Sequence, residues 1–301
     1  MSTKSFPQLP DIDLKLLRIF SAIVKNGGFS AAQYDLNMSL PAISSAMTHL
    51  EGRLGFKLCE RGRGGFQLTE GGVVVHRELQ KLFSSIDGFQ ASVHDFKGDM
   101  HGRIAIAVDD AIITNFRCPL HRVIRRFVQT APDLDLTLLI MSPPKMEKAL
   151  LENRLNIAIG PFRQISDALE STLVYQETQL LCCGRGHPAF GLSDRQQIDD
   201  AIADSDYAAR SYNDESFNLD DTKFIKSVST SNMEALLALI LTGRYVGYLP
   251  RHFCEAWVDR GEIWTLLPEF YSYGVPISVV HRKNHKDPRV LLFLDSLKEH
   301  V

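Results

Sequence analysis

The stretch that decides the fold is FSAAQYDLNMSLPAISSAMTHLEGRLGFKLCERGRGG, residues 29–65. Its first part predicts two helices, over residues 30–36 and about 39–54, separated by a tight turn. Ser30 belongs to the residue types that cap helices well. Pro41 falls in the first turn of the second helix, where its missing N–H costs little. The pattern therefore predicts two helices joined by a turn.

The second of these helices has two different faces, and a further helix is predicted over residues 13–25. Ile43, Met47, Leu50 and Leu54 recur at helical spacing and predict the face that points to the core. The opposite face is small and uncharged, and it consists of Leu40, Pro41, Ser44, Ser45 and Thr48. Such a face lets a helix enter the DNA major groove and contact base edges or thymine methyl groups. A plain three-helix bundle with a solvated face explains the helices equally well.

The basic, glycine-rich segment that follows decides between these interpretations. FKLCERGRGGFQLT predicts a strand over residues 56–61, a turn at Gly64 and Gly65, and a strand over residues 66–69. Arg61 and Arg63 lie at the tip of this hairpin, where arginines can pair with phosphates or enter a minor groove. The sequence therefore predicts a winged helix–turn–helix, in which the helix reads the groove and the wing contacts the DNA backbone.

A long helix is predicted after the hairpin, with Thr69 as its N-cap residue. Its apolar residues alternate at spacings of four and three, as in a coiled-coil seam: Val75, Leu79, Leu82, Ile86, Phe89, Val93 and Phe96. Such a seam needs a partner helix. We favour a linker helix that forms a homodimer and presents two winged helices to an inverted repeat. Packing within the same chain is the alternative.

Strands and helices alternate after residue 98, as in a parallel sheet covered by helices. The first strands are predicted over residues 103–108, 134–140 and 155–160, with helices over 119–130 and 145–153. Later strands are predicted over 178–184, 206–210, 226–231, 245–250, 263–267 and 275–282, with helices over 232–242, 251–260 and 287–300.

Composition and charge exclude several classes of protein. The chain has 301 residues, 45% of them hydrophobic, and a net charge of −3. Residues 1–98 carry 11 Lys and Arg against 9 Asp and Glu, so a DNA-binding function rests on where charges lie rather than on totals. No apolar run approaches the ~18 residues of a membrane span, and prolines and aspartates interrupt the N-terminus where a signal peptide needs an apolar core. We expect a cytoplasmic protein without membrane contact.

Five scattered cysteines give no CxxC pair, and so predict neither a disulfide framework nor a zinc site. Adjacent Cys182 and Cys183 would point to opposite faces of a strand. The sequence lacks HExxH, P-loop and G-x-S-x-G motifs, and its GRGG stretch belongs to the wing. We therefore expect no catalytic residue, no metal and no cofactor other than a small organic effector, with a carboxylate as the favoured class.

The chain resembles the LysR-type transcriptional regulators over its full length. The supporting motifs are the stretch from residue 29 to the LTEGG at 68–72, then LENRLNIAIG at 151–160, HP at 187–188 and GYLP at 247–250. The resemblance implies a winged helix–turn–helix over residues 1–70, a dimerisation helix over 71–98 and an effector domain over 99–301. It also implies a homodimer or a dimer of dimers that binds promoter DNA, with RNA polymerase as a further partner.

The effector domain of this family is similar to type 2 periplasmic binding proteins, which have two α/β lobes joined by two crossover strands. Lobe one would then comprise about 101–161 and 270–301, and lobe two about 162–269. The resemblance adds Ser30 and Ser39 to the reading surface and places Arg61 and Arg63 on the wing. Family members often have Gln at the position of Leu40 and Arg at that of Ser45 or Thr48. Base reading by this helix should therefore rely on apolar contacts and DNA shape.

Ligands of two-lobed α/β domains bind where the carboxyl ends of strands meet the N-termini of helices. The candidates at or just after the ends of the predicted strands are Asp109, Asp110, Thr114, Ser142, Phe162, Arg210, Thr230 and Ser231. Hydroxyl groups at a helix N-terminus suit an anion, although ordinary N-capping explains Ser142, Thr230 and Ser231 as well. For Arg210 an anion clamp competes with a surface salt bridge. Two neighbouring aspartates favour a ligand that also carries a hydroxyl or an amine.

These observations predict a DNA-binding transcriptional regulator controlled by a small molecule bound between two lobes. A regulator controlled by oxidation of Cys182 and Cys183 is one alternative. A solute-binding domain with an N-terminal protein-interaction module is another.

Overall fold

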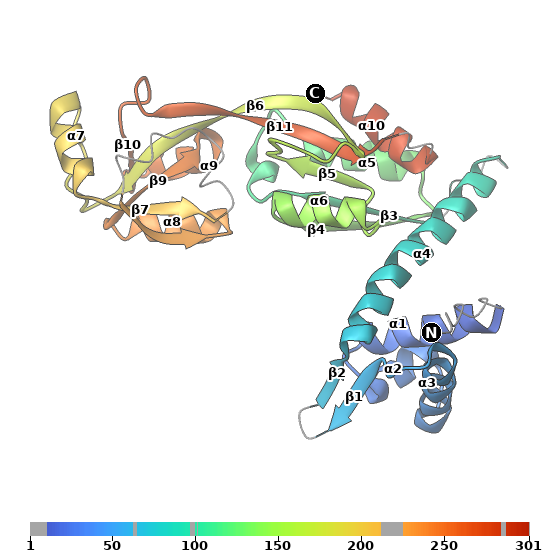
Figure 1. Ribbon diagram of the computed structural model, residues 1–301. Helices are drawn as coiled ribbons and strands as arrows, with labels where there is room; N and C mark the ends of the chain where they lie inside the picture. Colours follow the sequence, from blue (N-terminus) through green and yellow to red (C-terminus); the bar gives the residue numbers. More distant parts are fainter. Residues whose placement is uncertain are drawn as a thin grey trace. The chain divides into compact units, whose positions relative to one another are not determined.

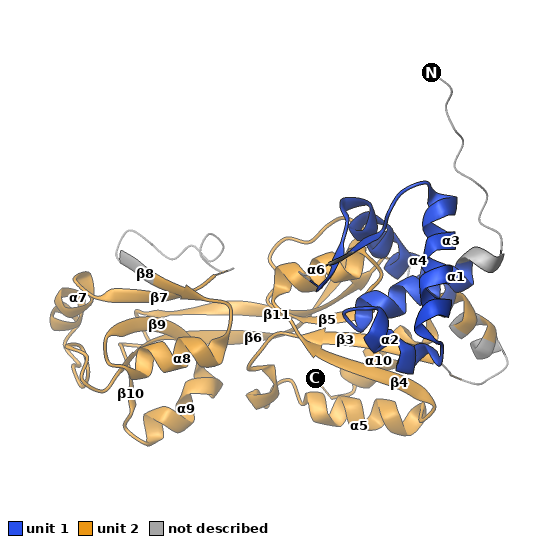
Figure 2. Ribbon diagram, turned by 90° about the horizontal axis from the view of Figure 1, so that it is seen from below, with its two compact units in different colours: residues 1–86 blue, residues 87–301 orange. Residues whose placement is uncertain are grey.

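The computed structural model of the chain describes residues 11–62, 65–96, 100, 102–211, 225–283 and 287–300. The chain divides into two compact units, residues 1–86 and 87–301, which Figure 2 shows in different colours. The boundary falls inside the long helix that follows the wing. Each unit is described by itself below.

The N-terminal unit is a three-helix bundle followed by a two-stranded hairpin and the start of a long helix (Figure 1). Its elements are α1 (Asp11–Lys25), α2 (Phe29–Leu36), α3 (Leu40–Leu54), β1 (Cys59–Gly62), β2 (Gly65–Leu68) and α4 (Glu70–Phe96). Its core is built on Phe20 and Ile23 of α1 and on Ile43, Met47 and Leu50 of α3, all buried. The apolar face predicted for residues 39–54 is therefore the face that packs inward.

Two element boundaries in this unit were predicted wrongly. Helix α2 begins at Phe29, whose side chain is buried, and Gly28 rather than Ser30 is its N-cap residue. Strand β1 begins at Cys59 rather than at residue 56, because the Glu51 carboxylate accepts the Leu58 N–H at 2.9 Å and holds that segment against α3.

Close packing explains the two glycines of the LTEGG stretch. A Cβ on Gly72 would lie 1.9 Å from the Leu58 carbonyl oxygen, and a Cβ on Gly71 would lie 2.7 Å from the Phe56 ring. Thr69 caps α4 as predicted, since its hydroxyl oxygen accepts the Gly72 N–H at 3.0 Å. The start of α4 is thus fixed against the segment that leads into the wing.

The apolar seam of α4 splits into two halves. In the first half Leu79 is buried, and Val75 and Leu82 pack partly against the core of the N-terminal unit. In the second half Phe89 is 70% and Val93 42% exposed, while Ile86 is half-buried and the side chain of Phe96 lies outside the described residues. Packing within the chain therefore accounts for the first half of the seam and leaves apolar side chains of the second half exposed.

The C-terminal unit is built on one mixed sheet with helices on both faces (Figure 1). Its strands are β3 (Gly102–Val108), β4 (Leu134–Ile140), β5 (Ile157–Gly160), β6 (Leu169–Gly184), β7 (Asp206–Arg210), β8 (Ile225–Thr230), β9 (Tyr245–Pro250), β10 (Ile263–Thr265) and β11 (Ser272–Arg282). Its helices are η1 (Ile112–Thr114), α5 (Leu120–Thr130), α6 (Pro143–Leu151), α7 (Arg195–Ala203), α8 (Met233–Leu241), α9 (Arg251–Asp259) and α10 (Pro288–Lys298). The strand order along the sheet is β4-β3-β5-β11-β6-β9-β7-β8, and β10 pairs with β6.

The sheet is parallel only at its two ends. Strands β3, β4 and β5 pair in parallel in lobe one, and β7, β8 and β9 do so in lobe two. Between them β6 and β11 pair antiparallel over residues 169–180 and 272–282 and run from one lobe to the other (Figure 1). This confirms two lobes joined by two crossover strands, with parallel pairing inside each lobe.

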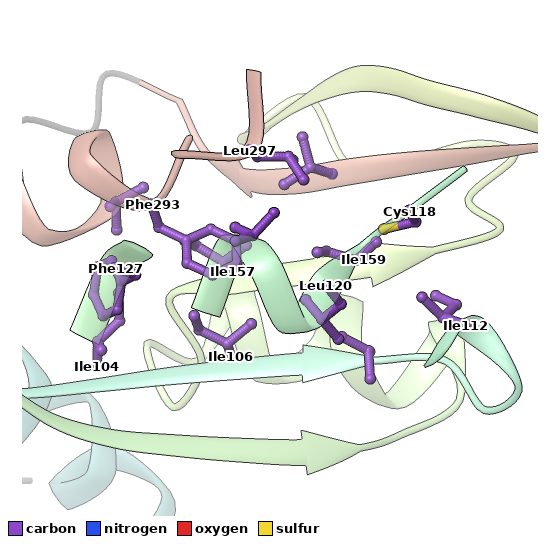
Figure 3. Packing of buried hydrophobic residues seen from close by; sticks show 14 of the residues in the cluster. Ile104, Ile106, Ile112, Cys118, Leu120, Phe127, Ile157, Ile159, Phe293 and Leu297 are labelled. Atoms are coloured by element: carbon purple, nitrogen blue, oxygen red, sulfur yellow. The ribbon is translucent and has the colours of Figure 1, made fainter. Parts of the chain in front are cut away.

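Each lobe has apolar clusters on both faces of the sheet. Figure 3 shows one cluster of lobe one, in which Ile104 and Ile106 of β3 pack against α5 and α10. Phe127 and Phe293 meet there edge to face, with ring centroids 5.6 Å apart. This packing holds β3 rigidly, and residues 109 and 110 directly follow its end.

Within the described ranges, none of the helices has both the length and the apolar character that crossing a bilayer requires.

Candidate functional site

The predicted DNA-reading residues are Ser30 of α2, Ser39 at the N-cap position of α3, and residues of α3 itself. Ser30, Ser39, Leu40, Pro41, Ser45 and Thr48 are exposed, and Ser44 is half-buried. The inward packing of Ile43, Met47 and Leu50 fixes which side of the helix remains available. The structure therefore brings these residues onto one accessible surface of the N-terminal unit.

Gln33, which the sequence analysis missed, organises the turn before α3. Its side-chain oxygen accepts the Leu40 N–H at 3.1 Å, and its side-chain nitrogen donates to the Ser30 carbonyl at 3.2 Å. Ser39 occupies the N-cap position of α3 but makes no capping hydrogen bond with its side chain. Its exposed hydroxyl is thus not used to hold the helix. A Gln seven residues before a predicted helix start is too weak a sequence signal to find this contact.

The Thr48 hydroxyl already makes one hydrogen bond within α3. Its Oγ1 donates to the Ser44 carbonyl at 3.0 Å. The methyl group and the oxygen lone pairs remain for an outside partner, which suits contact with a thymine methyl or a base donor. This geometry fits the expectation that α3 reads DNA through small and apolar contacts.

The wing is a short antiparallel hairpin in which Arg61 pairs with Phe66 and Gly62 with Gly65. Phe66 packs edge to face on Phe29, with centroids 6.1 Å apart, and so anchors β2 on α2. Arg61 lies in β1, but its side chain and the whole of Arg63 lie outside the described residues.

In the C-terminal unit, Asp110, Arg210 and the first residue of α8 meet across the two lobes. Two nitrogens of the Arg210 guanidinium donate to the two carboxylate oxygens of Asp110, at 2.8 and 3.1 Å. The Met233 N–H donates to the same carboxylate at 2.5 Å. Asp110 follows β3 in lobe one, whereas Arg210 and Met233 belong to lobe two. We call this set of contacts the interlobe latch.

Asp109 lies beside the latch in a buried position. Its carboxylate is 3.6 Å from the Arg210 guanidinium. Burial raises the pKa of Asp109 to about 8, while Arg210 opposes the rise and Asp110 and Glu177 add to it. At neutral pH the Asp109 carboxyl is therefore mostly protonated, and Asp110 is the carboxylate that pairs with Arg210 through two hydrogen bonds.

The structure contradicts the surface salt bridge predicted for Arg210, whereas the anion clamp stays a prediction. Its side chain is only 4% exposed, so the ion pair is not a surface salt bridge. Its guanidinium is bound by a carboxylate of the chain itself, so in this structure it is not an open anion clamp. The pairing joins residues 100 positions apart, and no local sequence pattern announces it.

A second connection between the lobes includes Thr114, which was predicted, and His252 and Glu177, which were not. Thr114 Oγ1 lies 2.9 Å from His252 Nδ1, and His252 Nε2 lies 2.9 Å from a carboxylate oxygen of Glu177. His252 follows the end of β9, so the rule of polar residues after strands could have found it. Glu177 lies in the half of β6 that was not predicted.

A cavity of about 510 Å³ adjoins this second connection. Lobe one lines it with Asn115, Phe116 and Arg117, and β6 and α9 line the opposite side through Glu177 and His252. The cavity therefore has polar walls from both lobes.

The remaining predicted effector residues lie in other settings. Ser142 occupies the N-cap position of α6 without a side-chain capping bond. Thr230 Oγ1 accepts the Asn232 N–H at 3.2 Å in the turn before α8, and Ser231 is exposed. Phe162 is buried in the core of lobe one. Of the predicted set, Asp109, Asp110, Thr114 and Arg210 take part in the described contacts between the lobes.

Two family models match the chain. The model described as "Bacterial regulatory helix-turn-helix protein, lysR family" matches residues 14–73, and the model described as "LysR substrate binding domain" matches residues 97–301. The chain belongs to the LysR family of transcriptional regulators. This confirms the resemblance, and it makes the N-terminal unit a DNA-binding domain and the C-terminal unit an effector-binding type of domain.

Relatives of this LysR-family chain support the assignment over its full length. It is 34% identical over 288 residues to the HTH-type transcriptional activator BauR of Pseudomonas aeruginosa, covering 95% of this chain and 94% of that protein. The fold is similar to that of full-length CbnR complexed with its target DNA, with a TM-score of 0.67 at 21% identity, covering 95% and 99% of the two chains. It is also similar to LysG from Corynebacterium glutamicum with bound effector Arg, with a TM-score of 0.52 at 17% identity, covering 95% and 96%.

Proposed function

We propose that this LysR-family regulator responds to a small organic molecule that binds between the two lobes of its C-terminal unit. The observation that carries the proposal is the interlobe latch, because the lobes are held together there by polar contacts that a polar ligand can replace. A ligand shifts such an equilibrium only through its different affinity for the two lobe arrangements. Through α4 this change would alter how paired DNA-binding units sit on their operator.

We infer further that the regulator acts as a homodimer or a dimer of dimers. The exposed apolar residues in the second half of α4 support a helix–helix contact between two copies. Two copies related by a two-fold axis would bind an inverted repeat in double-stranded DNA. The chain would do so in the cytoplasm, without catalytic activity and with RNA polymerase as a partner at the promoter.

Control by cysteine oxidation receives little support. Cys182 and Cys183 are fully buried on opposite faces of β6, and burial raises the pKa of the Cys183 thiol to about 12. Reactive cysteines are accessible and have a lowered thiol pKa. The ligand-controlled function is therefore the better proposal.

The wing provides the direct test of DNA recognition. If Arg61 contacts a phosphate, Arg61→Ala weakens binding to all duplexes and reduces the slope of log K against log salt by about one. Operator fragments selected from random duplexes by the full-length protein would be titrated at several salt concentrations. Arg244→Ala, which removes an arginine of lobe two paired with Asp206, is the control and should leave the slope unchanged. An unchanged slope in Arg61→Ala would contradict the assigned role of the wing.

A further inference from the structure

Asp110 is bound in the way that proteins bind a free carboxylate. Its two oxygens take three hydrogen bonds, two from the planar fork of Arg210 and one from the Met233 N–H. A bidentate arginine is the strongest common recognition of a carboxylate. The first N–H groups of a helix add a favourable dipole for negative charge. These donors together form a complete carboxylate site.

The donors and the bound carboxylate come from different lobes. Arg210 ends β7 and Met233 begins α8, both in lobe two, whereas Asp110 extends from β3 of lobe one. The Asp110 side chain is 11% and the Arg210 side chain 4% exposed, so little water reaches the pair. The site in lobe two is therefore filled by the other lobe.

We propose that Asp110 is a built-in occupant of a carboxylate-binding site in lobe two, and that the effector is a carboxylate that binds by displacing it. This inference rests on the proposed function and names the chemical class of its ligand. Displacement breaks the interlobe latch at the same moment as the ligand gains its contacts. Binding and the rearrangement of the lobes are thus one event.

A competing internal carboxylate lowers the apparent affinity for the effector. If the site is free in only a fraction of molecules, the apparent Kd rises by the inverse of that fraction. Removal of the Asp110 carboxylate should therefore strengthen the binding of external carboxylates. A purely structural ion pair would bind acetate only after its carboxylate is removed, whereas a displaceable carboxylate lets the wild type bind acetate weakly and saturably as well.

Chemical rescue tests this proposal on the full-length protein, with acetate as the probe. Asp110→Ala empties the site, and the thermal unfolding of the C-terminal unit is followed by the fluorescence of Trp257 and Trp264 while sodium acetate replaces sodium chloride at constant ionic strength. We expect a saturable rise of Tm with an apparent Kd about tenfold or more below that of the wild type. Acetamide, which has the same shape without the charge, should not produce it.

Asp109 is a second carboxylate near Arg210 and must be controlled. The double variant Asp109→Asn/Asp110→Ala lacks both of these carboxylates, so its response to acetate should be at least as strong as that of Asp110→Ala. Adding Arg210→Gln to Asp110→Ala should abolish the response. Asp110→Ser, whose smaller uncharged side chain leaves room for acetate, serves for the same comparison if Asp110→Ala does not fold.

Asp206→Asn is the matched control, because it removes a carboxylate that pairs with Arg244 within lobe two, 2.8 Å away, and makes no part of the latch. Its response to acetate should equal that of the wild type. Equal acetate affinity in the wild type and in the Asp110 variants would overturn the proposal. The readout is independent of DNA, so operator binding by the same wild-type protein is measured separately and tests the proposed function itself.

Discussion

At the scale of the residue, Asp109 has a setting that is unusual for a carboxyl group. It lies at the end of a rigid strand, is buried, and faces Arg210 of β7, its neighbour Asp110 and Glu177 of β6. Burial disfavours the charged carboxylate more than Arg210 favours it, so the pKa rises from 3.8 to about 8. The folded protein then holds a proton that the unfolded chain has already released.

This difference predicts how stability depends on pH. The contribution of Asp109 to the free energy of unfolding is fully present below pH 4. It is lost as pH rises to 8, by up to about 1.4 kcal/mol per pH unit. The Asp109→Asn variant has no ionisable group at this position. Its free energy of unfolding should therefore increase relative to that of the wild type as pH rises from 5 to 8. Urea unfolding of both proteins, followed by tryptophan fluorescence, measures the difference. A constant difference over this range would show that Asp109 is ionised in the folded protein.

Two glycines of α4 show how the surroundings of a residue decide the effect of the same substitution. Gly72 lies against the Leu58 carbonyl, whereas a Cβ on Gly88 would meet nothing within 4 Å. Gly72→Ala should destabilise the N-terminal unit by about 1–3 kcal/mol, because backbone atoms must move apart. Gly88→Ala should be neutral or stabilising by up to about 1 kcal/mol, because Ala is a better helix former.

Circular dichroism melts of both glycine variants, together with operator binding, would check this prediction. Gly72→Ala should also weaken operator binding, since the wing follows Leu58 directly. Equal melting temperatures for the two variants would contradict the packing argument.

At the scale of the element, α4 changes partner along its length. Its first turns belong to the core of the N-terminal unit, and its later turns expose Phe89 and Val93. Exposed apolar residues at coiled-coil spacing are unfavourable in water unless another helix covers them. The helix is therefore part of a core in its first turns and leaves apolar side chains uncovered in its later turns.

If a second copy covers the later turns, replacing both side chains should reduce the assembly. The double variant Phe89→Ser/Val93→Ser is expected to have a smaller mass in solution than the wild type, as measured by sedimentation equilibrium. It should keep the melting temperature of the N-terminal unit, because Val75, Leu79 and Leu82 are untouched. Gln90→Ser, an exposed neighbour off the seam, is the control. An unchanged mass in the double variant would assign dimerisation to another surface.

Sequence patterns predicted those elements whose apolar residues form a regular stripe and failed where they do not. Helix α3 and strands β3, β4 and β9 have such stripes and were found. The first half of β6 was missed because residues 170–173 are four exposed residues in a row, so the segment lacks the alternating pattern of a strand. Helix α7 was missed because only Ile198 and Ile202 of its nine residues are buried.

The site was predictable only in part for a related reason. Residues after strands can be listed from the sequence, and Asp109, Asp110, Thr114 and Arg210 were. Which of them pair depends on how the two lobes meet, and that is a contact between residues about a hundred positions apart. The candidate residues could therefore be predicted from the sequence, but the pairing of Asp110 with Arg210 could not.

At the scale of the whole molecule, the two units have separate cores and should respond separately to changes. Both tryptophans lie in lobe two, so their fluorescence reports on the C-terminal unit. We expect Gly72→Ala to lower the melting transition seen by circular dichroism while leaving the transition seen by tryptophan fluorescence in place. A parallel loss of both signals would indicate that the units unfold as one.

The paired crossover strands set a limit on how the lobes can move. Because β6 and β11 are hydrogen-bonded to each other along their length, with one irregularity between Ile277 and Ser278, they form a ribbon rather than two loose tethers. A two-stranded ribbon twists far more easily than it stretches or shears. Release of the latch should accordingly turn one lobe about the ribbon axis and change the angle between their outer surfaces more than the distance between them. The binding of a molecule a few ångströms long would thus produce a rotation that displaces the far edges of the domain.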